Sequence, residues 1–319
     1  MHSRKPVDVA ATAIMVALCL TWGAQQVAIK AIAGALDPLM QVALRSAIAA
    51  CFVWVFGRVI TRDPWLPNLW CRSGMIVGLL FAAEFLCIAQ GLRWTTASHM
   101  AVFLYTAPLF AAIGLHVRLP EERLGVRQWI GVGISFAGIA VTFLAGGENS
   151  ISQTGFTQGL LGDAMGLLAG AAWGLTTVVV RSSKLSDAPA SQTLYYQLMG
   201  AALVLLPLAM LDGRGSFPAF SGIVWTSMIF QTLAVSFVSY LIWFWMLRHY
   251  LAARLGIMAF MTPLFGVLLG IWLLDEAVSD EFIAGAFLSL AGLLMVNVSS
   301  RAKRPMPQPR LAPQPGEFR

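Results

Sequence analysis

Long apolar stretches separated by short polar loops dominate the pattern of hydrophobic and polar positions along this chain. A membrane-spanning helix needs about 20 mostly apolar residues to cross roughly 30 Å of hydrocarbon. The pattern therefore predicts an all-α integral membrane protein with ten transmembrane helices. We place these spans near residues 8–31, 37–60, 74–93, 95–117, 125–145, 159–181, 189–211, 222–246, 251–274 and 281–299.

The composition favours a chain that is solvated by lipid. Of 319 residues, 58% are hydrophobic and 11% are charged, whereas about a quarter of the residues of soluble proteins are charged. So few charges would not cover the surface of a soluble domain of this length. The lipid bilayer is therefore the first expected partner of this protein.

Lysine and arginine residues set the predicted orientation, because cytoplasmic loops carry an excess of them. With the N-terminus in the cytoplasm, most of the 21 basic residues fall on the inner side, and the outer loops hold only Arg93 and Arg214. We therefore expect a multi-pass protein of a bacterial inner (plasma) membrane with both termini in the cytoplasm. The basic, proline-rich tail at 301–319 is predicted to be a disordered cytoplasmic extension.

Several other kinds of function lack their signatures. The cysteines occur singly and the four histidines stand apart, without CxxC or HExxH spacing, so we expect no metal site, no cofactor and no intramembrane enzyme. The net charge of +6 comes without a glycine-rich phosphate loop or an aromatic–basic patch. Nucleic acid is therefore not an expected partner.

The two halves of the chain repeat one another. Matching positions in constant order are Trp22-Gly23 with Trp173-Gly174, Pro38 with Pro189, Pro108 with Pro263, Glu122 with Glu276, and Gly131 and Gly138 with Gly285 and Gly292. We predict one repeat at 1–150 and a second at 151–300. Because each repeat holds an odd number of spans, the second enters the membrane inverted, around a central cavity. Such inverted repeats underlie alternating access in many secondary transporters.

The same positions carry a family resemblance. Trp22-Gly23 followed by Lys30, Pro38 followed by Arg45, Ala107-Pro108, and the Pro-Glu-Glu-Arg-Leu segment at 120–124 resemble the EamA family of the drug/metabolite transporter superfamily. The resemblance covers about residues 8–299. It implies a ten-helix carrier that exports amino acids or other small metabolites, most similar to the aromatic amino acid exporter type. In the second repeat Tyr196 replaces Arg45, which indicates an asymmetric pocket.

Charged residues inside spans are costly and usually face the bundle interior. Glu84 is a candidate to bind a substrate ammonium group or to carry a proton in antiport; its alternative is a neutral, hydrogen-bonded side chain. Arg45 is a candidate for a substrate carboxylate, and snorkelling to the outer interface is its alternative. For Lys30 snorkelling is the simpler reading, with a functional role as the alternative. His99 is expected to be a satisfied interfacial histidine, with a proton relay as the alternative.

Uncharged candidates complete the predicted substrate site. They are aromatic, amide and thioether side chains within spans: Trp22, Gln25, Gln26, Tyr105, Trp173, Tyr195, Tyr196, Gln231, Phe260 and Met261. Of the adjacent Gln25 and Gln26, at most one is expected to face the cavity. Helix packing is the alternative for Trp22 and Trp173.

Pro108 and Pro263 are predicted kinks or hinges, because proline removes a backbone hydrogen bond from a helix. Spaced glycines are assigned to helix packing. The acids Glu121, Glu122, Asp275 and Glu276 are expected to stabilise the starts of the helices that follow them, with gating as the alternative.

The leading prediction is thus a secondary transporter that exports amino acids, aromatic ones included, or related small metabolites by alternating access. A nucleotide-sugar or sugar-phosphate exchanger is the rival within the superfamily, but phosphate would call for several basic groups at depth. A channel is the alternative from another class. Proton coupling stays open, since it rests on Glu84 alone.

Overall fold

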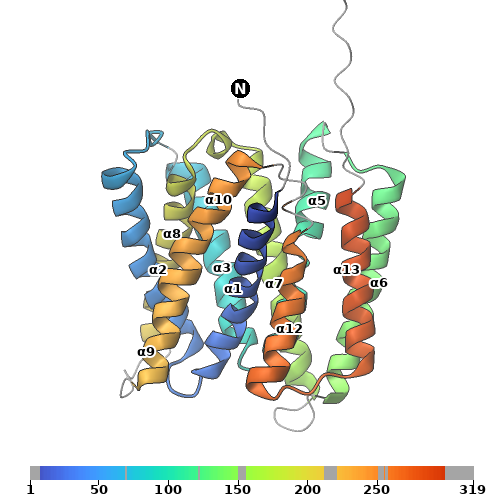
Figure 1. The fold of residues 1–319 in the computed structure, drawn as a ribbon. Helices are drawn as coiled ribbons and strands as arrows, with labels where there is room; N and C mark the ends of the chain where they lie inside the picture. The colour runs from blue at the N-terminus through green and yellow to red at the C-terminus, as the bar shows by residue number, and fades with distance from the viewer. Residues whose placement is uncertain are drawn as a thin grey trace, which may run out of the picture.

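The computed structural model describes residues 8–68, 70–120, 123–149, 156–211, 221–250, 255 and 258–298. Throughout these ranges the ordered elements are helices, and they run roughly side by side in one bundle (Figure 1). Glu121, Glu122 and the tail from Arg301 lie outside the described residues, so the expectations for them stay predictions.

The elements of the first half are α1 (Val9–Ala31), α2 (Pro38–Val55), the π-helical η1 (Phe56–Ile60) and η2 (Trp70–Gly74), α3 (Met75–Gly91), α4 (Ala97–Leu104), α5 (Ala107–Arg118) and α6 (Val126–Asn149). Those of the second half are α7 (Phe156–Arg181), the short η5 (Lys184–Ser186), α8 (Ala190–Leu211), α9 (Gly222–Ile229), the π-helical η6 (Phe230–Ser239), α10 (Tyr240–His249), α12 (Met261–Leu274) and α13 (Asp280–Val298).

In the described part of the chain, seven helices are long and apolar enough to cross a membrane. They are Val9–Ala31, Pro38–Ile60, Arg72–Gly91, Ala97–Arg118, Thr157–Arg181, Ala190–Leu211 and Gly222–Trp243, and Val126–Thr142 and Met261–Leu274 are shorter apolar helices. The prediction of an all-α, multi-pass membrane protein is thereby confirmed.

Side-chain caps explain why several helices begin where they do. Asp8 accepts a hydrogen bond from the backbone N–H of Ala11 (2.7 Å) at the start of α1. Asp37 accepts one from the N–H of Leu39 (2.9 Å) at the start of α2, where Pro38 occupies the first turn. Such caps satisfy backbone donors that have no partner within the helix. They allow very short connections between neighbouring helices.

Glycines set the closest helix contacts. α6 and α13 lie side by side (Figure 1), and a Cβ atom added to Gly131 would come 2.8 Å from the carbonyl oxygen of Gly292. Between α3 and α8, a Cβ atom on Gly78 would lie 2.9 Å from the carbonyl oxygen of Tyr196. Larger side chains would force these helices apart, as expected for small residues at membrane helix interfaces.

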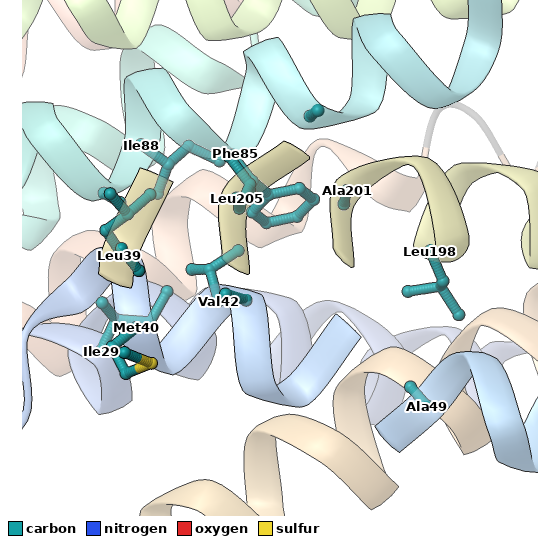
Figure 2. Packing of buried hydrophobic residues seen from close by; sticks show 14 of the residues in the cluster. Ile29, Leu39, Met40, Val42, Ala49, Phe85, Ile88, Leu198, Ala201 and Leu205 are labelled. Atoms are coloured by element: carbon teal, nitrogen blue, oxygen red, sulfur yellow. The ribbon is translucent and has the colours of Figure 1, made fainter. Parts of the chain in front are cut away.

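The largest apolar core joins α1, α2, α3 and α8. In Figure 2, Phe85 and Ile88 of α3 lie among Leu39 and Val42 of α2 and Leu205 of α8. This core surrounds the middle of α2 and α3, which carry the two charged residues described next. It therefore holds those charges in an apolar environment.

Candidate functional site

Two charged side chains are buried where α2 and α3 meet the rest of the bundle. Arg45 on α2 is 1% exposed and Glu84 on α3 is 4% exposed. Arg45 Nε and Nη1 and Glu84 Oε2 have no hydrogen-bond partner in the described part of the chain. The Arg45 guanidinium instead lies over the ring of Phe85, 4.5 Å from its centre. Arg45 thus lies inside the bundle, and the snorkelling alternative does not describe it.

The two charges interact with each other and with a tyrosine. Arg45 and Glu84 are close enough for an electrostatic interaction, and Tyr240, at the start of α10, interacts with both. Burying charged groups without full hydrogen bonding costs free energy. A fold that keeps both charges in this state has donors and an acceptor available for a further molecule.

Aromatic side chains from four further parts of the chain surround these charges. Trp22 of α1 lies 6.5 Å from Tyr240 and 5.5 Å from Trp243, centre to centre, and its Nε1 donates to Ser239 Oγ (2.9 Å). Tyr105 meets Trp173 of α7 edge-on at 5.3 Å, and Tyr105 also interacts with Glu84. We call Trp22, Arg45, Glu84, Tyr105, Trp173 and Tyr240 the central cluster.

A helix break brings Tyr105 into this cluster. α4 ends at Leu104 and α5 begins at Ala107, with Pro108 in its first turn. The second half has an equivalent break, because Phe260 is non-helical directly before α12, which contains Pro263 in its first turn. Thr262 of α12 approaches Tyr105 and Cys19. Both expected proline positions thus lie at interruptions of helices, and a hinge role for them stays a prediction.

The three glutamine candidates are all buried. Gln25 and Gln26 are both buried, at 4% and 2% exposed. Gln26 Oε1 lacks a partner among the described residues. Gln231 Nε2 donates to Gln41 Oε1 (2.8 Å) and to Ser227 Oγ (3.1 Å). Gln231 therefore ties η6 to α2 and belongs to a structural network.

The remaining candidates are three aromatic residues and one methionine, and each has apolar or aromatic neighbours of its own. Tyr195 and Tyr196 lie 5.2 and 6.5 Å from Trp65, and the Tyr196 hydroxyl accepts a bond from Gln192 (2.8 Å). Phe260 packs with residues of α4, α5 and α13, and Met261 packs against the apolar contact of α1 with α10. Tyr195, Tyr196 and Phe260 thus contact other side chains, whereas Met261 shares its apolar neighbours with Trp22 of the central cluster.

A second polar group lies at the end of the bundle where α1 ends and α4 and α7 begin, the lower end in Figure 1. We call this the distal end. Lys30 Nζ donates to the carbonyl oxygens of Leu92 (2.8 Å) and Thr95. It is therefore bound to the backbone of the α3–α4 connection.

His99 of α4 belongs to this polar group as well. It is 5% exposed, and its Nδ1 lies 2.9 Å from Oδ2 of Asp163 on α7. Sequence reasoning missed Asp163, although an acidic residue inside the predicted span 159–181 was the available signal. Asp163 is itself 1% exposed.

Glu276 caps a different helix from the one expected. Its carboxylate accepts bonds from the backbone N–H groups of Ala97 (2.6 Å) and Ser98 (2.9 Å), and from Ser98 Oγ (2.6 Å). It therefore stabilises the start of α4, distant in sequence, and not the start of α13 that follows it. Beside it, Arg93 forms an ion pair with Asp37 at 2.6 Å.

No group of three or more histidine, cysteine or acidic side chains suited to a metal ion occurs within the described ranges. The central cluster instead offers a guanidinium, a carboxylate and aromatic rings. What such a site serves is indicated by comparison with known proteins.

The model of the EamA-like transporter family matches residues 10–144 and again residues 160–298. The chain belongs to the EamA-like transporter family. The resemblance inferred from Trp22-Gly23, Arg45 and Pro108 is thereby confirmed, and the chain is a membrane transporter by family.

Relatives of this EamA protein include transporters from archaea and bacteria. An uncharacterized transporter of Archaeoglobus fulgidus is 25% identical over 86% of this chain and 93% of its own length. The uncharacterized transporter YoaV of Bacillus subtilis is 23% identical over 88% and 94%. A probable amino-acid metabolite efflux pump of Escherichia coli is 24% identical over 86% and 90%.

One protein of known crystal structure shares the fold, with a TM-score of 0.63. It covers 92% of this EamA chain and 99% of its own, at 19% identity. At this identity the likeness concerns the fold alone.

Proposed function

We propose that this EamA-family protein is a secondary transporter that exports amino acids, aromatic ones included, or related small metabolites from the cytoplasm. The observation that carries the proposal is the pair of buried, incompletely hydrogen-bonded charges, Arg45 and Glu84, among aromatic rings. A zwitterion supplies a carboxylate to the guanidinium and an ammonium group to the carboxylate. Pockets for small molecules combine apolar walls with a few such polar groups.

The aromatic members of the central cluster suit the rest of such a substrate. The ring of Trp22 lies near that of Tyr240, and the ring of Tyr105 meets that of Trp173. Their rings offer apolar contact to a side chain, and aromatic faces also attract an ammonium group. The relative in Escherichia coli that is named a probable amino-acid metabolite efflux pump supports this class of substrate.

Two inverted five-span repeats, at 1–150 and 151–300, are the proposed architecture. Its support is that the family model matches twice along the chain and that helix breaks precede α5 and α12 at equivalent places. Ten spans with this symmetry would allow two exchangeable conformations around the central cluster. Pro108 and Pro263 would then serve as hinges.

The proposed orientation puts both termini in the cytoplasm, since the basic residues then follow the positive-inside rule. The distal end would face the outside, most simply of a bacterial inner membrane. Because Lys30, Arg93 and Glu276 bind partners across that end, the described conformation would be closed toward the outside.

A phosphorylated substrate receives less support from the same site. Phosphate groups favour several basic donors, whereas Arg45 is the basic member of the central cluster and Lys30 Nζ is bound to backbone carbonyls. An exchanger of nucleotide sugars or sugar phosphates would therefore need basic groups beyond this cluster.

Counterflow in proteoliposomes tests the proposal. Vesicles holding the purified protein are loaded with one unlabelled amino acid, and uptake of the same labelled amino acid is followed, with and without a pH gradient. We expect saturable counterflow, which an open channel cannot produce, with aromatic amino acids among the substrates. Arg45→Gln should abolish it, and Arg62→Gln, at an exposed loop position, is the matched control. Absence of counterflow for every amino acid tested, with folded protein, would refute the proposed substrate class.

A further inference from the structure

A second set of buried titratable groups lies at the distal end, apart from the central cluster. His99 Nδ1 lies 2.9 and 3.1 Å from the two carboxylate oxygens of Asp163, and the Thr95 hydroxyl donates to the same carboxylate. The ring of Phe282 stacks on the imidazole at 4.2 Å. The pair is thus closed off from water, although the proposed substrate site makes no use of it.

We propose that His99 and Asp163 form a proton-binding site, and that a bound proton favours the closed distal end. Proton binding is then coupled to the opening and closing of that end, which rests on the alternating-access function proposed above. The site differs from Glu84, which lies in the central cluster.

The charge of the pair provides the physical reason. Histidine is the side chain whose charge changes between about pH 5 and pH 8. With a neutral imidazole the pair carries one negative charge, and with a protonated imidazole it carries none. Burying a net charge costs more than burying a neutral, hydrogen-bonded pair. A closed end that excludes water therefore favours the neutral, hydrogen-bonded pair over the charged one, and by linkage a bound proton favours closure.

The other charged residues near His99 and Asp163 do not set the net charge of the pair. Lys30 of α1 and Glu276 of the α12–α13 connection carry opposite charges. Among the described residues, Arg93 is paired with Asp37, and Asp280 and Glu281 are exposed at the start of α13. Since Lys30 and Glu276 offset each other, the proton on His99 decides whether the group is neutral.

The pair also lies where opening has to occur. The Asp163 carboxylate holds α7 to Thr95, whose carbonyl accepts a bond from Lys30 of α1. Glu276 holds the α12–α13 connection to the start of α4. The backbones are in close contact as well, because a Cβ atom on Gly162 would come 2.8 Å from the Thr95 nitrogen. Separating α7 from α4 therefore means breaking the contact between His99 and Asp163.

A distance measurement across this contact tests the proposal without any substrate. In a chain whose four cysteines are replaced by serine, spin labels are placed at Gln158 and Ala277, both exposed, on either side of the pair. Pulsed electron–electron double resonance in lipid nanodiscs then gives the distribution of distances between the two labels at about pH 5.5 and about pH 8. His99→Asn keeps a donor near the Nδ1 position but does not titrate in this range, and Asp163→Asn removes the negative charge.

We expect the population with the longer distance to rise at least about threefold between the two pH values in the parent chain. His99→Asn should hold the longer distance at both values, whereas in Asp163→Asn the distance should not lengthen as the pH rises, because a neutral imidazole beside an amide carries no net charge. His249→Asn, at an exposed histidine whose Nδ1 contacts the carbonyl oxygen of Trp245 one turn earlier, should behave as the parent does.

The proton site is overturned if the longer-distance population of the parent chain does not change with pH. It is also overturned if that population still rises with pH, as in the parent, in either variant. Only monodisperse variants are measured. If one of the two variants does not fold, the other one is sufficient for the test. Because no transport is measured, a failure here leaves the proposed export function standing, and a failure of counterflow leaves this result standing.

Discussion

Replacing Glu84 with glutamine separates a substrate contact from a structural role. The Glu84 side chain is 4% exposed, and its Oε2 has no hydrogen-bond partner within the described part of the chain. The substitution keeps the volume and removes the charge. If Glu84 binds the ammonium group of the substrate, the variant should bind substrate more weakly and yet fold as well as the parent.

The expected size follows from the strength of a charged hydrogen bond. Such a bond contributes about 1.5–3 kcal/mol, and each 1.4 kcal/mol is roughly a factor of ten in affinity. The substrate concentration at half-maximal counterflow should therefore rise about 10- to 100-fold. Stability should stay close to that of the parent: Glu84 Oε2 has no hydrogen bond to lose among the described residues and a buried charge is removed, which offsets the loss of the nearby opposite charge for Arg45. Losing a partner from a fully hydrogen-bonded buried bridge would instead cost about 3–5 kcal/mol.

The assay combines concentration-dependent counterflow with thermal unfolding of the same preparations. Glu281→Gln, an exposed acid at the start of α13, is the control with the same change of chemistry. An unchanged half-maximal concentration in a stable Glu84→Gln protein would refute the ammonium contact. A large loss of stability would instead assign Glu84 to the architecture.

Three further predictions concern other parts of the structure. Gly200→Leu should lower the thermal unfolding temperature strongly, since the residue lies against the backbone of Gly78; an unchanged unfolding temperature would contradict the packing of α3 on α8. Glu276→Ala should weaken the start of α4 by about 1 kcal/mol, as loss of a cap does, and raise the hydrogen exchange of residues 97–100, whereas Asp280→Ala should leave that exchange unaltered. Pro108→Ala and Pro263→Ala should slow counterflow several-fold while equilibrium binding of substrate, followed by tryptophan fluorescence, keeps its affinity; equal losses in both measurements would argue against hinges.

The family and the all-α membrane architecture were predictable from the sequence because both depend on local or one-dimensional information. The length of an apolar stretch is matched to the bilayer thickness whatever its neighbours are. Trp22-Gly23, Pro108 and the spaced glycines occur as a pattern that needs no three-dimensional placement. The burial of Glu84 was predictable too, since a charge in the middle of a span has few alternatives to facing the interior. For Arg45 the sequence left snorkelling open, and its burial was decided by the structure.

Which side chains meet was decided only by the tertiary structure. Glu276 caps α4 across the bundle, Lys30 binds the backbone of a different connection, and Asp163 pairs with His99. Tyr196 looked equivalent to Arg45 in the repeat, yet it packs against Trp65. These partners are far apart in sequence, and the rotation and depth of each helix determine them. Nothing in a helix's own residues specifies those two quantities, because packing against its neighbours sets them.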